Sequence, residues 1–367
     1  MHNQPDADIA RLHQLLPREA DMSLRNGTKQ GTVRIGVLGL GRIAQHMGET
    51  LSAMRQDPRY SQLAEPYACA TRNDEARARN YADTFGFTKA YGSYEQLLDD
   101  PEVDLVYIAT PHVFHKDQAI AAMQHGKNVL VEKAFTLNAQ QARLVIEESQ
   151  DTRLLCAEAI WTRYMPSRTL LVQALESGVI GDVVQMHADL SYPLTHKQRL
   201  VDPALGGGIL LDCGIYALNF GGMIYPNANV TRMLSNVVMS PEGVDRTFQA
   251  SAVLSNGVLT SSSASMLCAS PRLGIIQGTK GYIIVGNINN PEYIDVYAAD
   301  HTLIQRITPP EQLTGYEYEV AAAAQAVLDG RIECVQMPHS QTIHMLEAMD
   351  GLRADWAMRY PAENKQG

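Results

Sequence analysis

The chain has 367 residues, of which 45% are hydrophobic and 19% charged, as is ordinary for a folded globular protein. This length exceeds that of a typical single domain, so we expect two domains. The formal net charge of −10 argues against nucleic acid as the main partner. The five cysteines are far apart and form no Cys-x-x-Cys pair, so neither a disulfide framework nor a metal site is expected.

The sequence predicts neither export nor membrane insertion. The N-terminus, MHNQPDADIARLHQLLPREAD, has no apolar signal core. No run approaches the roughly 18 apolar residues that a membrane span requires. We therefore expect a cytoplasmic protein without a membrane partner. Residues 1–32 are polar and end in RNGTKQGT, which indicates a loosely attached extension.

Strands and helices alternate over residues 33–155, which we predict to be the first domain. VRIGVLG is a nearly continuous apolar run closed by glycine, as expected for a strand buried on both faces. Similar runs follow at 66–71, 103–110, 128–133 and 153–159, with helical segments between them. This α/β alternation predicts a Rossmann domain, that is, a doubly wound parallel sheet.

Residues 156–367 form the second expected domain, in which strand-like runs follow one another with few helices between them. Asn256-Gly257 is a strong hairpin signal. We therefore predict an α/β domain with an open, mostly antiparallel sheet. Helical segments near 316–329 and 340–358 close the chain, and the second of these is a candidate to pack back on the first domain.

GVLGLGRIA places Gly39-x-Gly41-x-x-Ala44 directly after the first strand. Gly39 permits a tight turn and Gly41 lets the backbone approach a pyrophosphate, while the next helix presents free N–H groups at its positive end. We therefore predict dinucleotide binding at this turn, which also contains Arg42 and Ile43. The alternative is a tight turn without a ligand.

The end of the second strand favours NADP over NAD. NAD sites usually carry an acid there for the ribose hydroxyls, whereas this chain has Thr71 and Arg72. Thr71 can hydrogen-bond a phosphate, and Arg72 can clamp one or lie flat on the adenine. Arg77 adds positive charge nearby. Asp74 is an alternative ribose ligand, so the sequence leaves NAD open.

NVLVEK places Glu132 and Lys133 at the carboxyl end of a predicted strand, which is the edge where open α/β sheets bind ligands. A surface ion pair is the alternative, but the neighbouring residues on both sides are apolar. We therefore predict that Lys133 faces the cleft between the two domains.

GGGILLDCGIYALN reads as a short apolar helix that contains Asp212 and Tyr216. Residues at i and i+4 share a helix face, so we expect both side chains to point the same way, toward the cleft. Gly214 inside a helix costs about 1 kcal/mol relative to alanine, which a close approach by ligand or backbone would explain. The alternative is a packed helix whose tyrosine hydroxyl finds a backbone partner.

Five motifs, GLGRIA, ATPHVFH, VEKAFTLN, EAIWTRYMP and GGGILLDCGIYALN, occur in the order typical of the Gfo/Idh/MocA oxidoreductases. The chain resembles this family over about residues 33–360, most of all the branch of dimeric dihydrodiol and NADP-dependent D-xylose dehydrogenases. The resemblance implies an active site between the domains and a homodimer built on the face of the second sheet. It also implies that Lys133 is catalytic, Tyr216 transfers a proton and Asp212 lines the substrate pocket.

The resemblance further implies that Thr110, Pro111 and His115 run beside the nicotinamide ribose. The chain departs from the family at Ala134, where proline usually follows the lysine, and at His112, where asparagine is usual. The complete set of predicted cofactor contacts is Gly39, Gly41, Arg42, Ile43, Thr71, Arg72, Arg77, Thr110, Pro111, His115, Glu132, Lys133 and Arg163. Trp161, Asp212 and Tyr216 are the predicted substrate contacts, and bracing of the domain joint is the alternative role of Arg163.

These residues predict an NADP-dependent dehydrogenase that transfers a hydride between nicotinamide C4 and a secondary alcohol or carbonyl of a sugar, polyol or dihydrodiol. The free tyrosine pKa is near 10, and we expect the charge of Lys133 to lower the pKa of Tyr216 toward neutrality. Asp212 opposes that effect, so it is expected to bind a substrate hydroxyl or hold Lys133. The alternative is a catalytically retired NADP-binding regulatory or assembly protein, which would need neither Lys133 nor Tyr216.

Overall fold

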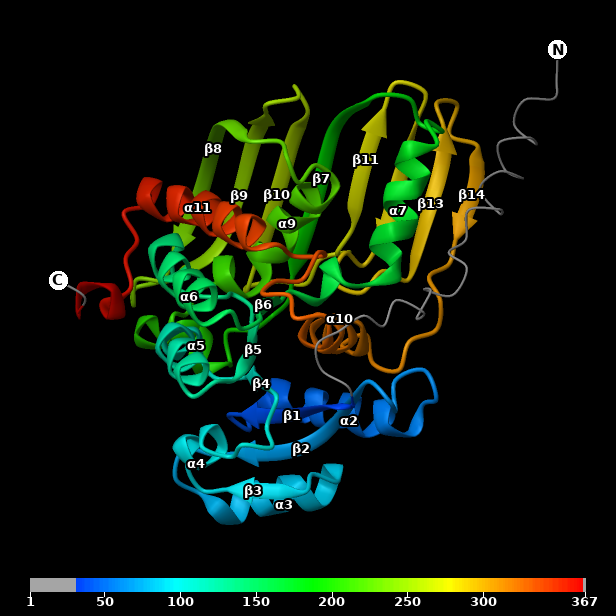
Figure 1. Ribbon diagram of the computed structural model, residues 1–367. Coiled ribbons are helices and arrows are strands. Elements are labelled where there is room, and N and C mark those ends of the chain that lie inside the picture. The colour runs from blue at the N-terminus through cyan, green and yellow to red at the C-terminus, as the bar shows by residue number, and fades with distance from the viewer. Residues whose placement is uncertain (1–30, 366–367) are drawn as a thin grey trace.

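The computed structural model describes residues 31–365 and contains two sheets with their helices (Figure 1). The predicted extension, residues 1–32, lies outside the described residues apart from its last two. The chain passes from the first sheet to the second near residue 160 and returns to the first near its C-terminal end.

The first sheet is parallel, with the strand order β3-β2-β1-β4-β5-β6. Its strands are β1 (Val33–Leu38), β2 (Ala64–Ala70), β3 (Lys89–Tyr91), β4 (Leu105–Ile108), β5 (Asn128–Glu132) and β6 (Cys156–Ala159). The order reverses between β1 and β4, which is where doubly wound sheets bind ligands. The Rossmann prediction is confirmed, with β3 as an additional short strand.

Helices connect these strands, and local caps determine where several of them start. The helices are α2 (Arg42–Gln56), α3 (Glu75–Phe85), α4 (Tyr94–Leu98), α5 (His115–Gln124) and α6 (Ala139–Thr152). Asp74 caps α3 by accepting a hydrogen bond from the Arg77 N–H at 2.9 Å, and Asn138 caps α6 through the Gln141 N–H at 2.8 Å. The caps fix the loops after β2 and β5, which carry predicted site residues.

The second sheet has the order β14-β13-β12-β11-β7-β10-β9-β8. Its strands are β7 (Val183–Ser191), β8 (Val230–Met239), β9 (Asp245–Leu254), β10 (Leu259–Ser265), β11 (Gly274–Gly278), β12 (Gly281–Gly286), β13 (Tyr293–Ala298) and β14 (Leu303–Ile307). Among the described strands the β7–β10 pair is parallel and the other pairs are antiparallel, which confirms the predicted mostly antiparallel sheet. The predicted Asn256-Gly257 turn joins β9 to β10.

Helices α7 (Pro166–Glu176), α9 (Ile215–Ile224) and α11 (His339–Asp355) lie along one face of the second sheet (Figure 1). Helix α11 also packs against α6 of the first half. The remaining helices are α8 (Gln198–Val201) and α10 (Glu317–Leu328), and α10 packs against α2 and against β1 and β2. Two helices from the end of the chain therefore contact the first half.

One helical stretch, Pro203–Ile224, is long and apolar enough for a membrane span by length and composition. This corrects the expectation that no such run exists, because its mean hydropathy is 1.3 despite the glycines and Asp212. Of its most apolar window, 78% is buried inside the protein, as in a core helix.

Candidate active site

Lys133 directly follows strand β5 and contacts the second half of the chain. The Lys133 ammonium donates a hydrogen bond to the main-chain oxygen of Asp212 at 2.7 Å, and it lies 3.3 Å from Asp212 Oδ1. Both side chains are largely buried, with 15% of Lys133 and 8% of Asp212 exposed. A cation from the first half and a carboxylate from the second half therefore meet.

Tyr216 lies beside the same ammonium. The Lys133 Nζ is 4.9 Å from the centre of the Tyr216 ring, a distance at which a cation is attracted by the ring face. Within residues 31–365 the phenol hydroxyl makes no hydrogen bond, so its oxygen is not tied to a backbone partner. Lys133 thus contacts both predicted partners, but it reaches Tyr216 through the ring face.

The segment that carries Asp212 and Tyr216 differs from the single α-helix that the sequence predicts. Leu210–Gly214 is a π-helical turn, and α9 begins at Ile215. A π-turn adds a residue to the repeat, so the i,i+4 geometry of an α-helix does not apply there. The close neighbour of Gly214 is a side chain, because an added Cβ would lie 2.5 Å from the ring of Phe248.

Arg199, which the sequence analysis missed, is the second cation on Asp212. Its Nη2 lies 2.7 Å from Asp212 Oδ1, and 43% of its side chain is exposed. Burial opposes ionisation of Asp212, but the charges of Lys133 and Arg199 outweigh it and hold the pKa of Asp212 below its usual value. Asp212 is therefore a carboxylate that holds Lys133, one of its two predicted roles.

The pKa of Tyr216 lies well above 10, which corrects the prediction that Lys133 lowers it. Burial is the largest cause, and the nearby acids Glu132, Glu319 and Asp212 add to it. Because Asp212 compensates the charge of Lys133, that cation does not offset the burial. Tyr216 is therefore a neutral phenol, and it is suited to donate a proton.

Glu132 lies behind Lys133 as a buried supporting residue. Its Oε1 accepts a hydrogen bond from the Tyr107 hydroxyl, and its Oε2 accepts the Lys133 N–H at 3.1 Å. Burial raises the pKa of Glu132, and burial together with Glu132 raises the pKa of Glu319 in α10. Both oxygens of Glu319 are buried and unpartnered within the described residues. Glu132 thus braces the end of β5, and its predicted contact with the cofactor stays a prediction.

Thr110 and Pro111 lie in the loop after β4, as the sequence predicts, whereas His115 begins α5 directly after that loop. His115 is completely buried. Its Nε2 lies 2.8 Å from the Thr110 oxygen and its Nδ1 lies 3.0 Å from the Ala134 oxygen. Burial lowers the pKa of His115, so the neutral ring donates its one N–H to one of these carbonyls and faces the other, which places His115 between Thr110 and the loop after β5. Its predicted role as a direct cofactor contact is not supported by this burial.

His112, the residue in place of the family's asparagine, joins the same loop to the second half. Its Nδ1 lies 3.2 Å from the main-chain oxygen of Gly206, in the turn that precedes Asp212. Burial lowers the pKa of His112 to about 3, so the ring is neutral at physiological pH. A neutral ring in this position adds no charge to the Lys133–Asp212 pair.

The glycine turn has the tight backbone conformation at Gly39 that the sequence predicts. Gly39 has φ +90°, and a Cβ there would come within 2.7 Å of the Thr110 side chain. Gly41 immediately precedes α2, where Arg42 is exposed and Ile43 is half-buried. The turn therefore keeps its backbone free of side chains where a ligand would approach.

The loop after β2 presents Arg72 as an exposed cation. The Thr71 hydroxyl donates to the main-chain oxygen of Asp74 at 2.7 Å and accepts a hydrogen bond from the Asp74 N–H at 2.9 Å. The hydroxyl proton is therefore used within the loop. Its predicted hydrogen bond to a phosphate is therefore not available in this arrangement. Arg77 donates to the Leu40 oxygen of the glycine turn. Arg72 is exposed and makes no hydrogen bond or ion pair within residues 31–365.

Trp161 and Arg163 follow β6 at the joint between the halves. Trp161 stacks on Tyr316 with ring centres 4.4 Å apart. Arg163 is buried and its Nε donates to Asn219 Oδ1 at 2.6 Å, so it braces α9. Burial lowers the pKa of Arg163 to about 9. These contacts support the bracing alternative for Arg163.

The turn before the π-helical segment depends on glycine at position 208. Gly208 has φ +106°, and a Cβ there would overlap Asp245 Oδ1. The other oxygen of Asp245 accepts the Leu210 N–H at 2.7 Å and so anchors the start of the segment that carries Asp212 and Tyr216. Burial raises the pKa of Asp245 to about 7.

We expect Gly208→Ala to lower the free energy of unfolding by about 3 kcal/mol, because it adds a steric overlap to an unfavourable φ. Gly243→Ala is the matched control, since Gly243 has φ +92° with no atom within 4 Å of the added Cβ. That control should cost only about 1 kcal/mol. Urea unfolding of both variants measures the difference, and equal losses would show that Asp245 does not constrain the turn.

Within residues 31–365 no group of three or more His, Cys, Asp or Glu side chains is arranged to hold a metal ion. The described site is built from Lys133, Asp212, Arg199 and Tyr216.

Two family models match the chain. The model described as "Oxidoreductase family, NAD-binding Rossmann fold" matches residues 33–159, and the "GFO/IDH/MocA C-terminal domain" matches residues 169–284. The trans-1,2-dihydrobenzene-1,2-diol dehydrogenase of Xenopus tropicalis is 30% identical over 299 residues, which is 80% of this chain and 90% of that protein. The human enzyme of the same name is 28% identical over 341 residues, or 91% and 99% of the two chains.

Solved structures share the fold. A 3-ketoreductase from Actinomadura kijaniata in complex with NADP and TDP-benzene has a TM-score of 0.78 at 24% identity, covering 88% of this chain and 97% of that one. An aldose-aldose oxidoreductase from Caulobacter crescentus complexed with glycerol has a TM-score of 0.77 at 18% identity, with the same coverage.

Proposed function

The chain belongs to the Gfo/Idh/MocA oxidoreductase family, and we propose that it transfers a hydride between C4 of NADP and a secondary alcohol or the corresponding carbonyl. The proposed substrates are sugars, polyols or dihydrodiols, in keeping with the relatives' names. The observation that carries this proposal is the convergence of Lys133, Asp212 and Tyr216 from the two halves, with the ammonium 2.7 Å from Asp212 O and 4.9 Å from the Tyr216 ring centre.

The first half fits a dinucleotide. The turn at Gly39 and Gly41 leaves the backbone open to a pyrophosphate, and the exposed Arg72 is a free cation at the end of β2, where a 2′-phosphate would be held. When bound, the nicotinamide supplies or accepts the hydride. The residues of this chain then orient the substrate and move the proton.

Tyr216 is the proposed proton-transfer residue. As a neutral phenol it donates its proton to the oxygen of a carbonyl while that carbon is reduced. Lys133 stabilises the phenolate that is left, because its ammonium lies over the ring, and Asp212 holds Lys133 in place. In the oxidative direction the same phenol must first lose its proton, which burial opposes.

We also propose that the protein is cytoplasmic and dimeric, with the dimer formed on the face of the second sheet that α9 and α11 leave uncovered. On β8, Ser235 bonds Trp356 on the covered face, whereas Leu234 and Val238 point to the other side and are 61% and 53% exposed. Apolar side chains exposed in this way favour association with a second copy.

NADPH absorbance in the presence of aldoses, diols and dicarbonyls tests the proposed activity. Oxidation of NADPH by a carbonyl, or reduction of NADP by an alcohol, is the expected result. Cofactor binding without turnover on any member of the panel would instead favour the retired NADP-binding protein, for which Lys133 and Tyr216 have no use.

Arg72→Ala should raise the Kd of NADPH about 10-fold or more and change that of NADH less than about 2-fold. The physical reason is that the free guanidinium can pair with a 2′-phosphate, which NADH does not carry. Titration calorimetry with both cofactors measures this. Arg79→Ala is the control, because Arg79 is also exposed but pairs with Glu75 at 2.6 Å. Equal losses for NADPH and NADH would contradict the assignment.

A further inference from the structure

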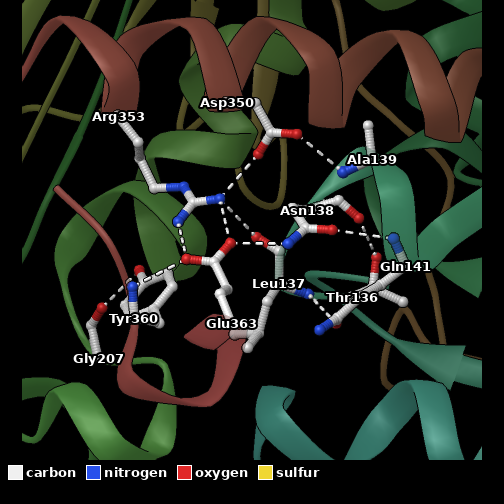
Figure 2. Close-up of polar contacts among 10 residues, drawn as sticks. All are labelled: Thr136, Leu137, Asn138, Ala139, Gln141, Gly207, Asp350, Arg353, Tyr360 and Glu363. Carbon is white, nitrogen blue, oxygen red and sulfur yellow. Dashed lines mark hydrogen bonds and ion pairs between the residues drawn. The ribbon is translucent and has the colours of Figure 1, made fainter. Parts of the chain in front are cut away.

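The C-terminal end of the chain returns to the loop that follows Lys133. In Figure 2, Arg353 of α11 makes a two-pronged ion pair with Glu363, each nitrogen 2.9 Å from one carboxylate oxygen. Arg353 Nη2 also lies 2.8 Å from Asp350 Oδ1. The guanidinium is buried, so these carboxylates compensate a charge that water does not reach.

This cluster holds the loop after β5. Arg353 Nη2 donates to the Leu137 oxygen at 3.1 Å, and Asn138 Nδ2 donates to Glu363 Oε1 at 2.7 Å. The Ala139 N–H donates to Asp350 Oδ2 at 2.9 Å. Every residue from 137 to 139 is thus bonded to the end of the chain, a few residues after Lys133 (Figure 2).

The same cluster also holds the turn at residues 206–208, which precedes Asp212. The Tyr360 hydroxyl donates to the Gly207 oxygen at 2.7 Å, and the Tyr360 N–H donates to Glu363 Oε2 at 2.8 Å. The Arg353 guanidinium lies 4.9 Å from the centre of the Tyr360 ring. Gly206 packs directly on the other loop, since a Cβ there would lie 2.7 Å from Leu137 Cδ2.

We propose that Tyr360, Arg353 and Glu363 form a clasp that sets the separation of Lys133 from Asp212, and that they are positioning residues for the proposed reaction. One carboxylate, Glu363, is bonded to the loop after Lys133 and, through Tyr360, to the turn before Asp212. A small shift of either loop would lengthen the 2.7 Å bond from the ammonium to Asp212 O. This inference rests on the proposed function of Lys133 and Asp212.

Two mild variants test the clasp. Tyr360→Phe removes the hydroxyl bond to Gly207 and keeps the ring beside Arg353, while Glu363→Gln removes the charge and keeps the shape. Arg353 is left intact, because its removal strands two partly buried carboxylates, Asp350 and Glu363, and threatens folding. Glu347→Gln is the control, since it breaks the exposed Arg143–Glu347 pair, which joins the same helices α6 and α11.

Hydrogen–deuterium exchange of the free protein is the first measurement, because it needs no activity. We expect both clasp variants to raise amide exchange in 134–139 and 206–212 together, and the control variant to leave both segments unchanged. Faster exchange confined to the C-terminal residues would overturn the clasp whatever the enzyme does. A wild-type protein without turnover would contradict the proposed function alone.

Steady-state kinetics give the second measurement. Each clasp variant should lower kcat about 5- to 20-fold, with the Kd of NADPH within about 2-fold of the wild-type value. The acid limb of the kcat–pH profile should move to higher pH, because a looser Lys133 depresses the pKa of Asp212 less. In a Lys133→Met background Glu363→Gln should cause no further loss, because the clasp acts through Lys133. Full additivity of the two losses would show that Glu363 acts elsewhere.

Discussion

Lys133→Met is expected to lower kcat by at least about 100-fold while NADPH still binds. The ammonium is the only group that touches both Asp212 and the Tyr216 ring among the contacts described for residues 31–365. Its loss leaves Asp212 with Arg199 alone and removes the cation that stabilises a forming phenolate, and proton transfer typically supplies 10²–10⁴ of the rate. Single-turnover hydride transfer from NADPH measures the effect on the chemical step.

Lys89→Met is the matched control for that variant. Lys89 also pairs with a buried carboxylate, with its ammonium 3.1 Å from Asp100 Oδ2, but it lies in β3 at the far edge of the first sheet. This control should keep at least about half of the wild-type rate. A near-normal rate for Lys133→Met would show that Lys133 holds structure without taking part in the reaction.

The nucleotide half was predictable because its signals are local. Strand β1 is buried except at the half-buried Arg34 and therefore reads as a nearly continuous apolar run, and Gly39 needs a backbone conformation and a space that other residues do not fit. Strand β3 was missed because its three residues, Lys89–Tyr91, are only half-buried and form no recognisable pattern. Its place is set by pairing with β2, which the sequence does not display.

The second half was predictable where turns decide the outcome and unpredictable where packing does. Asn256-Gly257 produces its hairpin through local backbone preference. The π-helical turn at Leu210–Gly214 instead depends on two residues of β9. Asp245 accepts the Leu210 N–H, and the ring of Phe248 packs on Gly214. The sequence therefore identified Asp212 and Tyr216 as neighbours, but it placed them in one α-helix, whereas Asp212 lies in the π-helical turn and Tyr216 in α9.

The site shows the same division. Lys133, Asp212 and Tyr216 lie in recognisable motifs, and the structure places them in contact. Arg199 lies in the polar stretch THKQR, where nothing distinguishes it from a solvent-exposed surface residue. Only the fold reveals its pairing with Asp212. The pKa of Tyr216 depends on burial and on Glu319, which comes from α10 far along the chain.

Tyr216→Phe should lower kcat for carbonyl reduction by at least about 100-fold, with little change in the Kd of NADPH. The substitution keeps the ring that Lys133 contacts and removes only the proton donor. Because burial holds the pKa of Tyr216 well above 10, the wild-type phenol stays protonated at neutral and mildly alkaline pH. The reductive rate should therefore show no loss between about pH 6 and 9 from ionisation of this group, whereas a tyrosinate base would make it fall as the pH rises.

Tyr164→Phe separates loss of a proton donor from loss of a buried hydroxyl. Tyr164 is also buried in the C-terminal half. Its hydroxyl donates to the main-chain oxygen of Glu158 at 2.8 Å and not to a residue of the site. This control should lower stability by about 1 kcal/mol and leave kcat nearly unchanged. If Tyr216→Phe kept the wild-type rate, or if both variants lost activity equally, Tyr216 would not be the proton donor and Lys133 would act on another group.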